Sequence, residues 1–250
     1  MELDKDRVQW IEYDLFTHYS HVFAGTFLRH GGASSGPYVS LNAGDNVGDH
    51  PDAVKVNREL IHKQVQVRQI LYAKQVHGVD IIEITSKNLA KIPEADGLVT
   101  KEKQLGLAVT HADCQGAIFY DPQNEIIGVV HAGWKGLCKN IYQAMVDYLC
   151  NTLHSKSEDL IVCISPSLCP EHAEFKDYKE ELPRDFWDFQ KEKNHFDLWA
   201  IANKQLLDAG IQEQNIEMMQ DCTYKNSKDY FSFRRDKITG RHATVVALKE

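Results

Sequence analysis

The sequence lacks several features that would place the protein outside the ordinary globular class. Its 250 residues contain six cysteines and no Cys-x-x-Cys pair, which is too few for a disulfide framework. No stretch approaches the ~20 apolar residues of a membrane-spanning helix. The segment Met1–Arg7 has no apolar run, so we expect no secretory signal. We therefore expect a cytoplasmic protein with no membrane partner and with most thiols reduced.

Positive charge is also scarce. The chain has 28 Lys and Arg against 36 Asp and Glu, a net charge of -8, whereas surfaces that bind nucleic acids are basic. The stretch Phe233–Lys237 is the obvious candidate for a local basic patch. We expect no nucleic-acid partner, and the sequence leaves the oligomeric state open.

No internal repeat, low-complexity tract or linker rich in Pro, Gly or Ser divides the chain. We therefore predict a single catalytic domain over residues 1–250. The composition, 43% hydrophobic and 26% charged, is typical of a globular protein with a sizeable core.

Short apolar segments rich in branched and aromatic residues predict the strands. They cover residues 21–28, 70–76, 79–85, 105–110, 116–120, 126–131, 160–165 and 242–248. Three helices are predicted between them: one after a cap at Asp49, one through Leu137–Leu153, and one over Leu198–Ala209 that Asp197 caps and Gly210 ends. Because strands both alternate with helices and follow one another directly, we predict mixed sheets flanked by helices.

The segment Arg29–His50 breaks this pattern. It holds five of the chain's 15 glycines, at positions 31, 32, 36, 44 and 48, and glycine permits backbone conformations that other residues resist. Loops of this length in a compact domain are usually functional or disordered. Tyr38, Val39 and Leu41 within it favour an ordered loop.

Three metal-capable side chains each lie at or just beyond the end of a predicted strand, where sites gather in sheet folds. They are His77 in KQVHG, Cys114 in HADCQ and His131 in HAGWKG. Two imidazoles and a thiolate suit zinc, and three protein ligands leave one position open, as in catalytic zinc sites. Such a zinc ion lowers the pKa of bound water to about 7. The alternative is two satisfied core histidines and a buried thiol.

Further candidates flank this trio. Asp113 is a candidate general base, and His111 a candidate support for a ligand or a rival ligand. Both residues could instead be strand-end residues that bond to nearby backbone. Trp134 could form a wall for a planar ring or pack in the core.

Arginines offer forks for phosphate or carboxylate groups. Arg29 opens the glycine-rich loop and Arg58 lies on the first predicted helix, and these two are the candidate anion-binding residues. Three more arginines lie near the end of the chain, at positions 234, 235 and 241.

An ordered set of motifs resembles one known family. The motifs are FLRHGGASSGPYVSLNAGDNVGD, VKVNREL, KQVHG, EADGLVT, ADC, HAGWKG and DCTY followed by YFSFRRDKITGRHA, from about Thr26 to Leu248. This is the family formerly called multicopper polyphenol oxidases or laccase-domain proteins and now largely renamed purine nucleoside phosphorylases. Its bacterial members are also called peptidoglycan editing factors.

The resemblance implies a zinc site made by His77, Cys114 and His131. It implies a single α+β domain of α/β/β/α layers, similar to a bacterial toxin deamidase with a Cys–His site. Members are reported to cleave adenosine, inosine and methylthioadenosine with phosphate and to deaminate adenosine. The expected partners are therefore purine nucleosides and phosphate, with Arg29 or Arg58 holding the phosphate or the ribose.

The sequence departs from the family pattern in several places. Lys135 stands where an arginine is usual in HAGWRG, and Gln115 and Gly116 replace an apolar pair after ADC. His111 stands where an apolar residue or Thr is usual. The usual GPxIGPCCYEV has become residues 165–175, SPSLCPEHAEF. If this segment shapes the substrate pocket, specificity or activity changes with it.

Three other functions remain open from the sequence. Cys114 could be the nucleophile of an amide hydrolase, with His131 or His77 as base, acting on a peptidoglycan precursor or a protein amide. A copper oxidase needs many more convergent histidines than the 12 scattered along this chain offer. The altered 165–175 segment could mark a catalytically impaired member that binds a ligand.

Overall fold

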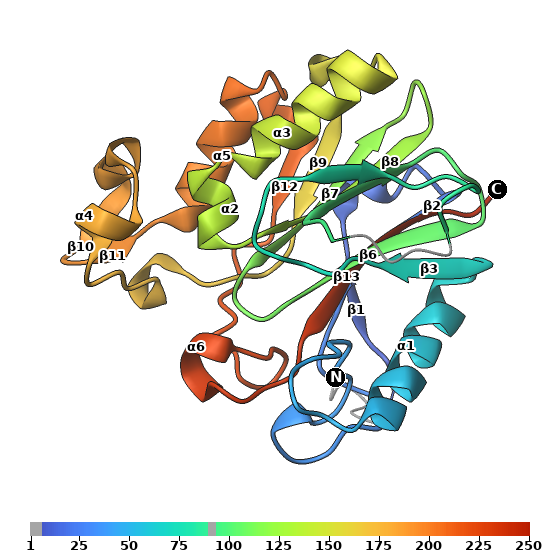
Figure 1. Ribbon diagram of the computed structural model, residues 1–250, viewed down its shortest axis with the longest axis horizontal. Coiled ribbons are helices and arrows are strands. Elements are labelled where there is room, and N and C mark those ends of the chain that lie inside the picture. Colours follow the sequence, from blue (N-terminus) through green and yellow to red (C-terminus); the bar gives the residue numbers. More distant parts are fainter. Residues whose placement is uncertain (1–6, 90–93) are drawn as a thin grey trace.

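The computed structural model describes residues 7–89 and 94–250. Most of the Met1–Arg7 segment therefore lies outside the described residues. Among those described, no helix combines the length and apolar character needed to cross a membrane. Two β-sheets form the centre of the molecule, with α1 outside one and α2, α3 and α5 outside the other (Figure 1).

The first sheet has five strands in the order β1-β2-β13-β6-β3. Neighbours run antiparallel except β3 and β6, which are parallel. The bounds are β1 Trp10–Glu12, β2 Val22–Phe27, β3 Gln69–Tyr72, β6 Leu105–His111 and β13 His242–Leu248.

The second sheet has six strands in the order β12-β9-β7-β8-β5-β4. Its two outer pairs, β12–β9 and β4–β5, are parallel and the inner pairs antiparallel. The bounds are β4 Ile81–Glu83, β5 Gly97–Thr100, β7 Gln115–Asp121, β8 Ile126–Ala132, β9 Ile161–Ile164 and β12 Ile216–Met218. A separate hairpin pairs β10 (Gln190–Glu192) with β11 (His195–Phe196).

The α-helices are short apart from two. Their bounds are α1 Pro51–Val65, α2 Trp134–Cys138, α3 Ile141–Asp147, α4 Tyr178–Glu181, α5 Leu198–Asp208 and α6 Phe233–Asp236. Asp197 caps α5 by accepting a hydrogen bond from Ala200 N (2.9 Å), and Gly210 follows with a φ of 91°, which confirms the predicted start and stop.

Apolar packing joins these elements in four layers. One core cluster, with Leu107 and Ile127, lies between the two sheets. Another packs Ile61 of α1 on the first sheet, and a third packs helices such as α3, through Met145, on the second. The predicted α/β/β/α arrangement of mixed sheets is therefore confirmed. Central strands such as β8 are buried on both faces, which explains their continuous apolar runs.

Two predicted helix features are wrong. The Leu137–Leu153 pattern is split, because Asn140 adopts a left-handed φ of 57° and its side chain caps a new helix, α3, by accepting from Gln143 N (3.1 Å). Asp49 does not cap α1, since the N-cap residue is His50 and makes no side-chain cap bond.

All eight predicted strands occur, although β3 ends at Tyr72, before the predicted end at residue 76. The short strands β1, β5, β10, β11 and β12 were not predicted. Each has two to four residues, which is too short to carry a periodic signal.

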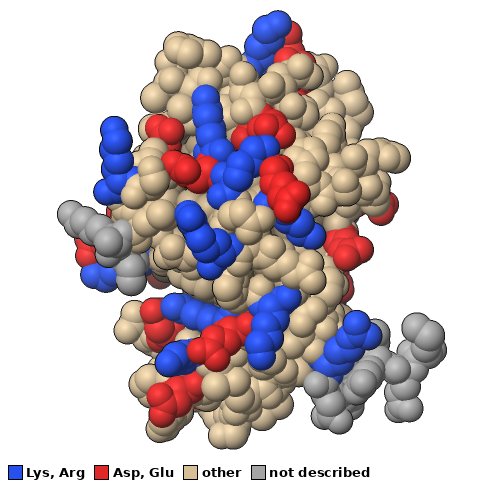
Figure 2. Space-filling model, turned by 90° about the vertical axis from the view of Figure 1, so that its right-hand side faces the viewer, with Lys and Arg blue, Asp and Glu red and all other residues tan. Residues whose placement is uncertain are grey.

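Charge is mixed on the surface. Acidic and basic side chains are interspersed over the face in Figure 2, so this face offers no extended area of one sign.

A buried asparagine orders the glycine-rich loop. Asn57 of α1 is fully buried, and its Oδ1 accepts a hydrogen bond from Ala33 N (2.7 Å). Its Nδ2 lies within 3.2 Å of Ser34 Oγ and the carbonyl oxygens of Ser40 and Asn42. One side chain of the VKVNREL motif therefore fastens both limbs of the loop to α1, and the predicted order of the loop is explained.

Replacing this side chain tests its role. Asn57→Ala removes the partner of Ala33 N and Asn42 O, whereas Ser34 Oγ and Ser40 O each keep another, so we expect the free energy of unfolding to fall by about 1–3 kcal/mol. Urea unfolding followed by circular dichroism measures the change. The exposed Lys63→Ala on the same helix is the control, and equal stabilities of the two variants would contradict the anchoring role.

Candidate metal centre

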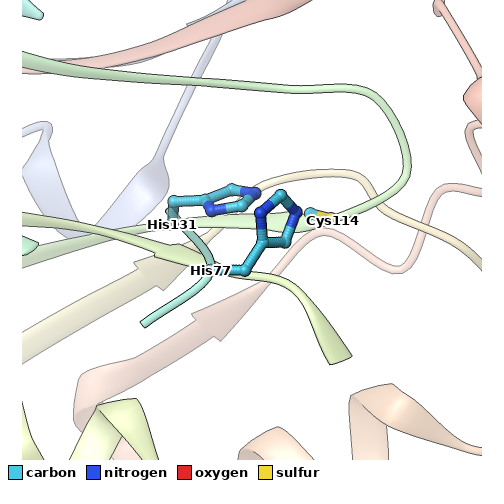
Figure 3. A group of neighbouring side chains, drawn as sticks. All are labelled: His77, Cys114 and His131. Atoms are coloured by element: carbon cyan, nitrogen blue, oxygen red, sulfur yellow. The ribbon is translucent and has the colours of Figure 1, made fainter. Parts of the chain in front are cut away.

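The sheet topology brings the three predicted ligands together. β3 and β6 are parallel neighbours, so their carboxyl ends meet at the same edge of the first sheet. From both ends the chain crosses to the second sheet, and the two crossings carry His77 and Cys114. β8 runs antiparallel to β7 with Ala132 opposite Gln115, which places His131 beside Cys114 (Figure 3).

The three side chains form a compact donor set. Their ligand atoms all lie within 4.8 Å of one another. The two imidazole rings meet edge to face at a centroid distance of 4.8 Å. His77 is exposed, Cys114 half-buried and His131 buried, so the group is buried on the His131 side and open to solvent on the His77 side. This geometry suits a metal ion with a free coordination position.

A buried carboxylate holds two of the donors in place. Asp96 is fully buried, and its Oδ1 lies 2.8 Å from His131 Nδ1. It also accepts hydrogen bonds from three successive backbone N–H groups, those of Val76, His77 and Gly78, at 2.7–3.1 Å. His77 has a left-handed φ of 57°, which lets these N–H groups converge on the anion.

Electrostatics favour a thiolate at Cys114. Burial raises the pKa of the thiol, but the nearby charge and hydrogen bond of His131, followed by those of His77, outweigh it and lower the pKa below the ordinary value. Burial lowers the pKa of His131, and Cys114 together with Asp96 raises it above the ordinary value. Both shifts favour the thiolate of Cys114 and the imidazolium of His131.

The first glycine of HAGWKG, Gly133, lies in close contact with two of the donor residues. A Cβ atom on Gly133 would lie 2.9 Å from His77 Cδ2 and 3.1 Å from Cys114 Sγ. Any side chain here would push two of the three donors apart.

Two cavities open beside the donor set. We call the first, of about 660 Å³, the arginine-side cleft, because Arg58 and Arg241 line it together with all three donors. We call the second, of about 510 Å³, the aromatic-side cleft, because Trp134 and Phe175 line it beside His77 and Cys114. Both volumes are in the range of small-molecule sites.

The two predicted anion-binding arginines are separated. Arg58 reaches the arginine-side cleft, where its Nε donates to Ala43 O (2.9 Å) and its guanidinium lies over the Tyr72 ring. Arg29 does not reach this cleft. Its guanidinium donates to the carbonyl oxygens of Val39, Ser227 and Tyr230, and so holds the loop instead.

The two candidates near Cys114, Asp113 and His111, form hydrogen bonds within the protein. Asp113 accepts hydrogen bonds from Thr223 Oγ1 (2.7 Å) and Arg234 N (2.6 Å). His111 is buried and its Nε2 pairs with Thr244 Oγ1 (2.8 Å). It lines the arginine-side cleft but is not part of the donor set.

The departures from the family pattern differ in their consequences. Lys135 is exposed, with its ammonium over the Trp134 ring, and lines neither cleft. Gln115 is buried and links Tyr142 OH (2.7 Å) to Leu198 O (3.2 Å). The 165–175 segment supplies a wall of the aromatic-side cleft, including Phe175.

Two residues of the site were not singled out from the sequence. Asp96 lies within the EADGLVT motif, and an acidic residue beside a buried apolar run is the signal that could have identified it. Arg241 follows Gly240 in the last motif. Burial lowers the pKa of its guanidinium, while the charges of Cys114 and Asp113 act in the opposite direction.

Two stacked mixed sheets with a His–Cys–His group at their shared edge define an α+β protein with a candidate metal centre. A model of the family described as multi-copper polyphenol oxidoreductase laccase matches residues 23–249. The chain belongs to this family, as the sequence motifs predict. The described residues bring together two groups of three metal-capable side chains, whereas a multicopper oxidase needs many more convergent histidines.

Relatives of known name cover nearly the whole chain. A purine nucleoside phosphorylase from Haemophilus influenzae is 31% identical over 90% of this chain and 94% of its own length. Purine nucleoside phosphorylase YlmD from Bacillus subtilis is 31% identical over 92% and 89%.

Solved structures agree with the observed architecture. The crystal structure of hypothetical protein YfiH from Bacillus licheniformis has a TM-score of 0.89 at 29% identity and covers 99% of this chain and 98% of that chain. YlmD from Geobacillus stearothermophilus has a TM-score of 0.87 at 30% identity, with 96% of both chains covered.

Removing the charge of the buried carboxylate tests its positioning role. Asp96→Asn keeps the shape but weakens the hold on His131 and on the backbone at His77, so we expect Zn²⁺ affinity to fall about 10–100-fold. Competition with a chromophoric chelator measures it. The exposed Asp80→Asn in the same crossing is the control, and unchanged affinity in Asp96→Asn would contradict the role.

Proposed function

We propose that the protein is a zinc-dependent purine nucleoside phosphorylase that also deaminates adenosine and phosphorolyses methylthioadenosine. The observation that carries the proposal is the donor set of His77, Cys114 and His131 between two clefts of ligand size. The names of the relatives supply the substrate class.

The chemistry of the donor set fits zinc. Because the Nδ1–H of His131 donates to Asp96, its Nε2 is left as the metal ligand. Cys114 would bind as thiolate and His77 from the exposed side, and three protein ligands leave a position for substrate or water. When bound, zinc supplies a Lewis acid that polarises a purine or lowers the pKa of a water molecule.

Arg58 and Arg241 would bind phosphate in the arginine-side cleft. Arg241 Nη1 donates to the carbonyl oxygens of Thr239 and Gly240 (2.9 and 3.0 Å), which fixes the guanidinium in the wall. Arg58 pairs weakly with the exposed Asp45 (3.4 Å), a contact that an incoming phosphate can replace. We therefore assign the anion-binding role predicted for Arg29 or Arg58 to Arg58 and Arg241.

The aromatic-side cleft would hold the purine. Trp134 and Phe175 meet at a centroid distance of 5.8 Å and offer apolar walls to a planar ring. In phosphorolysis a phosphate oxygen forms a bond to C1′ of the ribose, and the C1′–N9 bond breaks with its electron pair going to the purine. A nucleoside spanning Cys114 would place C1′ between the two clefts, within reach of a phosphate on the arginine side.

Loss of the thiolate ligand tests the assignment as a whole. In Cys114→Ala we expect zinc content to fall and phosphate-dependent cleavage of inosine and adenosine to decrease more than about a hundredfold. Elemental analysis and base release with and without phosphate measure both. The half-buried Cys138→Ala is the control, and zinc-loaded wild type without purine turnover would overturn the proposed activity.

Removal of one arginine tests phosphate binding alone. In Arg241→Gln we expect the KM for phosphate to rise about 10–100-fold, because a charge-assisted contact is lost, with zinc content unchanged. Steady-state kinetics at varied phosphate concentration measure this. The exposed Arg68→Gln should leave the KM unchanged, and a normal KM in Arg241→Gln would reject the assignment.

One observation favours a second candidate, an amide hydrolase. Asp96, His131 and Cys114 follow one another in the order of a carboxylate, base and nucleophile, an arrangement that supports acyl transfer by a thiolate. A thiolate bound to zinc is a poor nucleophile, so the two candidates respond oppositely to chelation. Amide hydrolysis that increases on zinc removal would favour the hydrolase.

A further inference from the structure

A second group of sulfur and nitrogen donors lies outside the candidate metal centre. Cys169, His172 and Cys222 place their ligand atoms within 4.8 Å of one another. In the structure the two cysteines form a disulfide, while the other four cysteines of the chain are free. The cysteines are buried and His172 is half-buried, so solvent reaches the group from the imidazole side.

The local backbone brings these side chains close together. Residues Pro170–His172 form a 3-10 turn, which places Cys169 and His172 side by side, with Nδ1 of His172 3.2 Å from Sγ of Cys169. The His172 ring stacks on Tyr224 at a centroid distance of 3.9 Å. This stacking fixes the plane of the imidazole.

The backbone also supports a thiolate at the partner cysteine. The N–H of Cys169 donates to Sγ of Cys222 (3.4 Å), and an N–H donor stabilises negative charge on sulfur. A β-bridge between Ser167 and Cys222 holds the two segments together. These contacts hold the two segments that carry the cysteines side by side.

Two thiolates and one imidazole are a ligand set for zinc, with a fourth position left for water or a further ligand. We propose that Cys169, His172 and Cys222 bind a second zinc ion in the reduced chain, and that the Cys169–Cys222 disulfide is the oxidised state that excludes it. The oxidant is a low-molecular-weight disulfide. Its S–S bond breaks, taking up two electrons from the two cysteine thiolates and two protons from solvent to give two thiols, while the two cysteine sulfurs join and the zinc ion is released.

This second site borders the first without sharing a ligand. Leu168, next to Cys169, donates its N–H to Asp113 O (3.0 Å). Thr223, next to Cys222, donates to the Asp113 carboxylate (2.7 Å). Asp113 immediately precedes Cys114, and Leu168 lines the aromatic-side cleft. The second site therefore lies beside a wall of this cleft.

Zinc content of the full chain, with and without a phosphine reductant, tests the proposal. After loading with Zn²⁺ and dialysis, we expect about two zinc ions per chain in reduced protein and about one after oxidation with oxidised glutathione. Reduced Cys169→Ser and His172→Ala should each bind about one ion fewer than wild type, and the control Cys138→Ser should match wild type. His172→Ala keeps both cysteines, so it remains informative if Cys169→Ser does not fold.

Cys114→Ala separates this proposal from the proposed function. If both sites bind zinc, the reduced variant retains about one ion and loses it on oxidation. If the first site binds none, reduced wild type and Cys114→Ala both hold about one ion, which His172→Ala lacks. The second site is overturned if zinc content is the same in reduced and oxidised wild type, or if His172→Ala binds as much as wild type.

Discussion

The candidate centre depends on one buried charge, the carboxylate of Asp96. It accepts hydrogen bonds from His131 and from three consecutive backbone N–H groups around His77. A buried carboxylate without such partners would be costly, and with them it fixes the tautomer of one imidazole and the backbone that carries the other. Asp96 directly precedes β5, so the second sheet positions the carboxylate that holds the donor set.

The position of the centre follows from the way the chain changes sheets. Both crossings from the first sheet to the second leave from parallel neighbours, β3 and β6, and therefore emerge side by side. Each crossing contains a residue with left-handed backbone, His77 in the first and Asp113 in the second. Residues in these crossings are not needed for packing between strands, so polar and metal-capable side chains can occupy them.

The segment of residues 165–175, where the sequence departs from the family motif, contacts the same region. It connects through Leu168 to Asp113 and forms part of the aromatic-side cleft. Cys169 and His172 within it meet Cys222 from the segment after β12. The second zinc site that we propose therefore lies beside the cleft, while His77, Cys114 and His131 lie together at the candidate metal centre.

The sequence by itself determined the layered class, every long strand, the capped helix α5 and the three donor residues, because continuous apolar runs and motif positions are local signals. Only the tertiary structure decided the break at Asn140, the separation of Arg29 from the cleft that Arg58 and Arg241 line, and the place of Asp96. The reason is that each depends on long-range contacts. Arg29 meets carbonyl oxygens of Ser227 and Tyr230, and Asp96 meets His131, and no local pattern encodes such distant pairings.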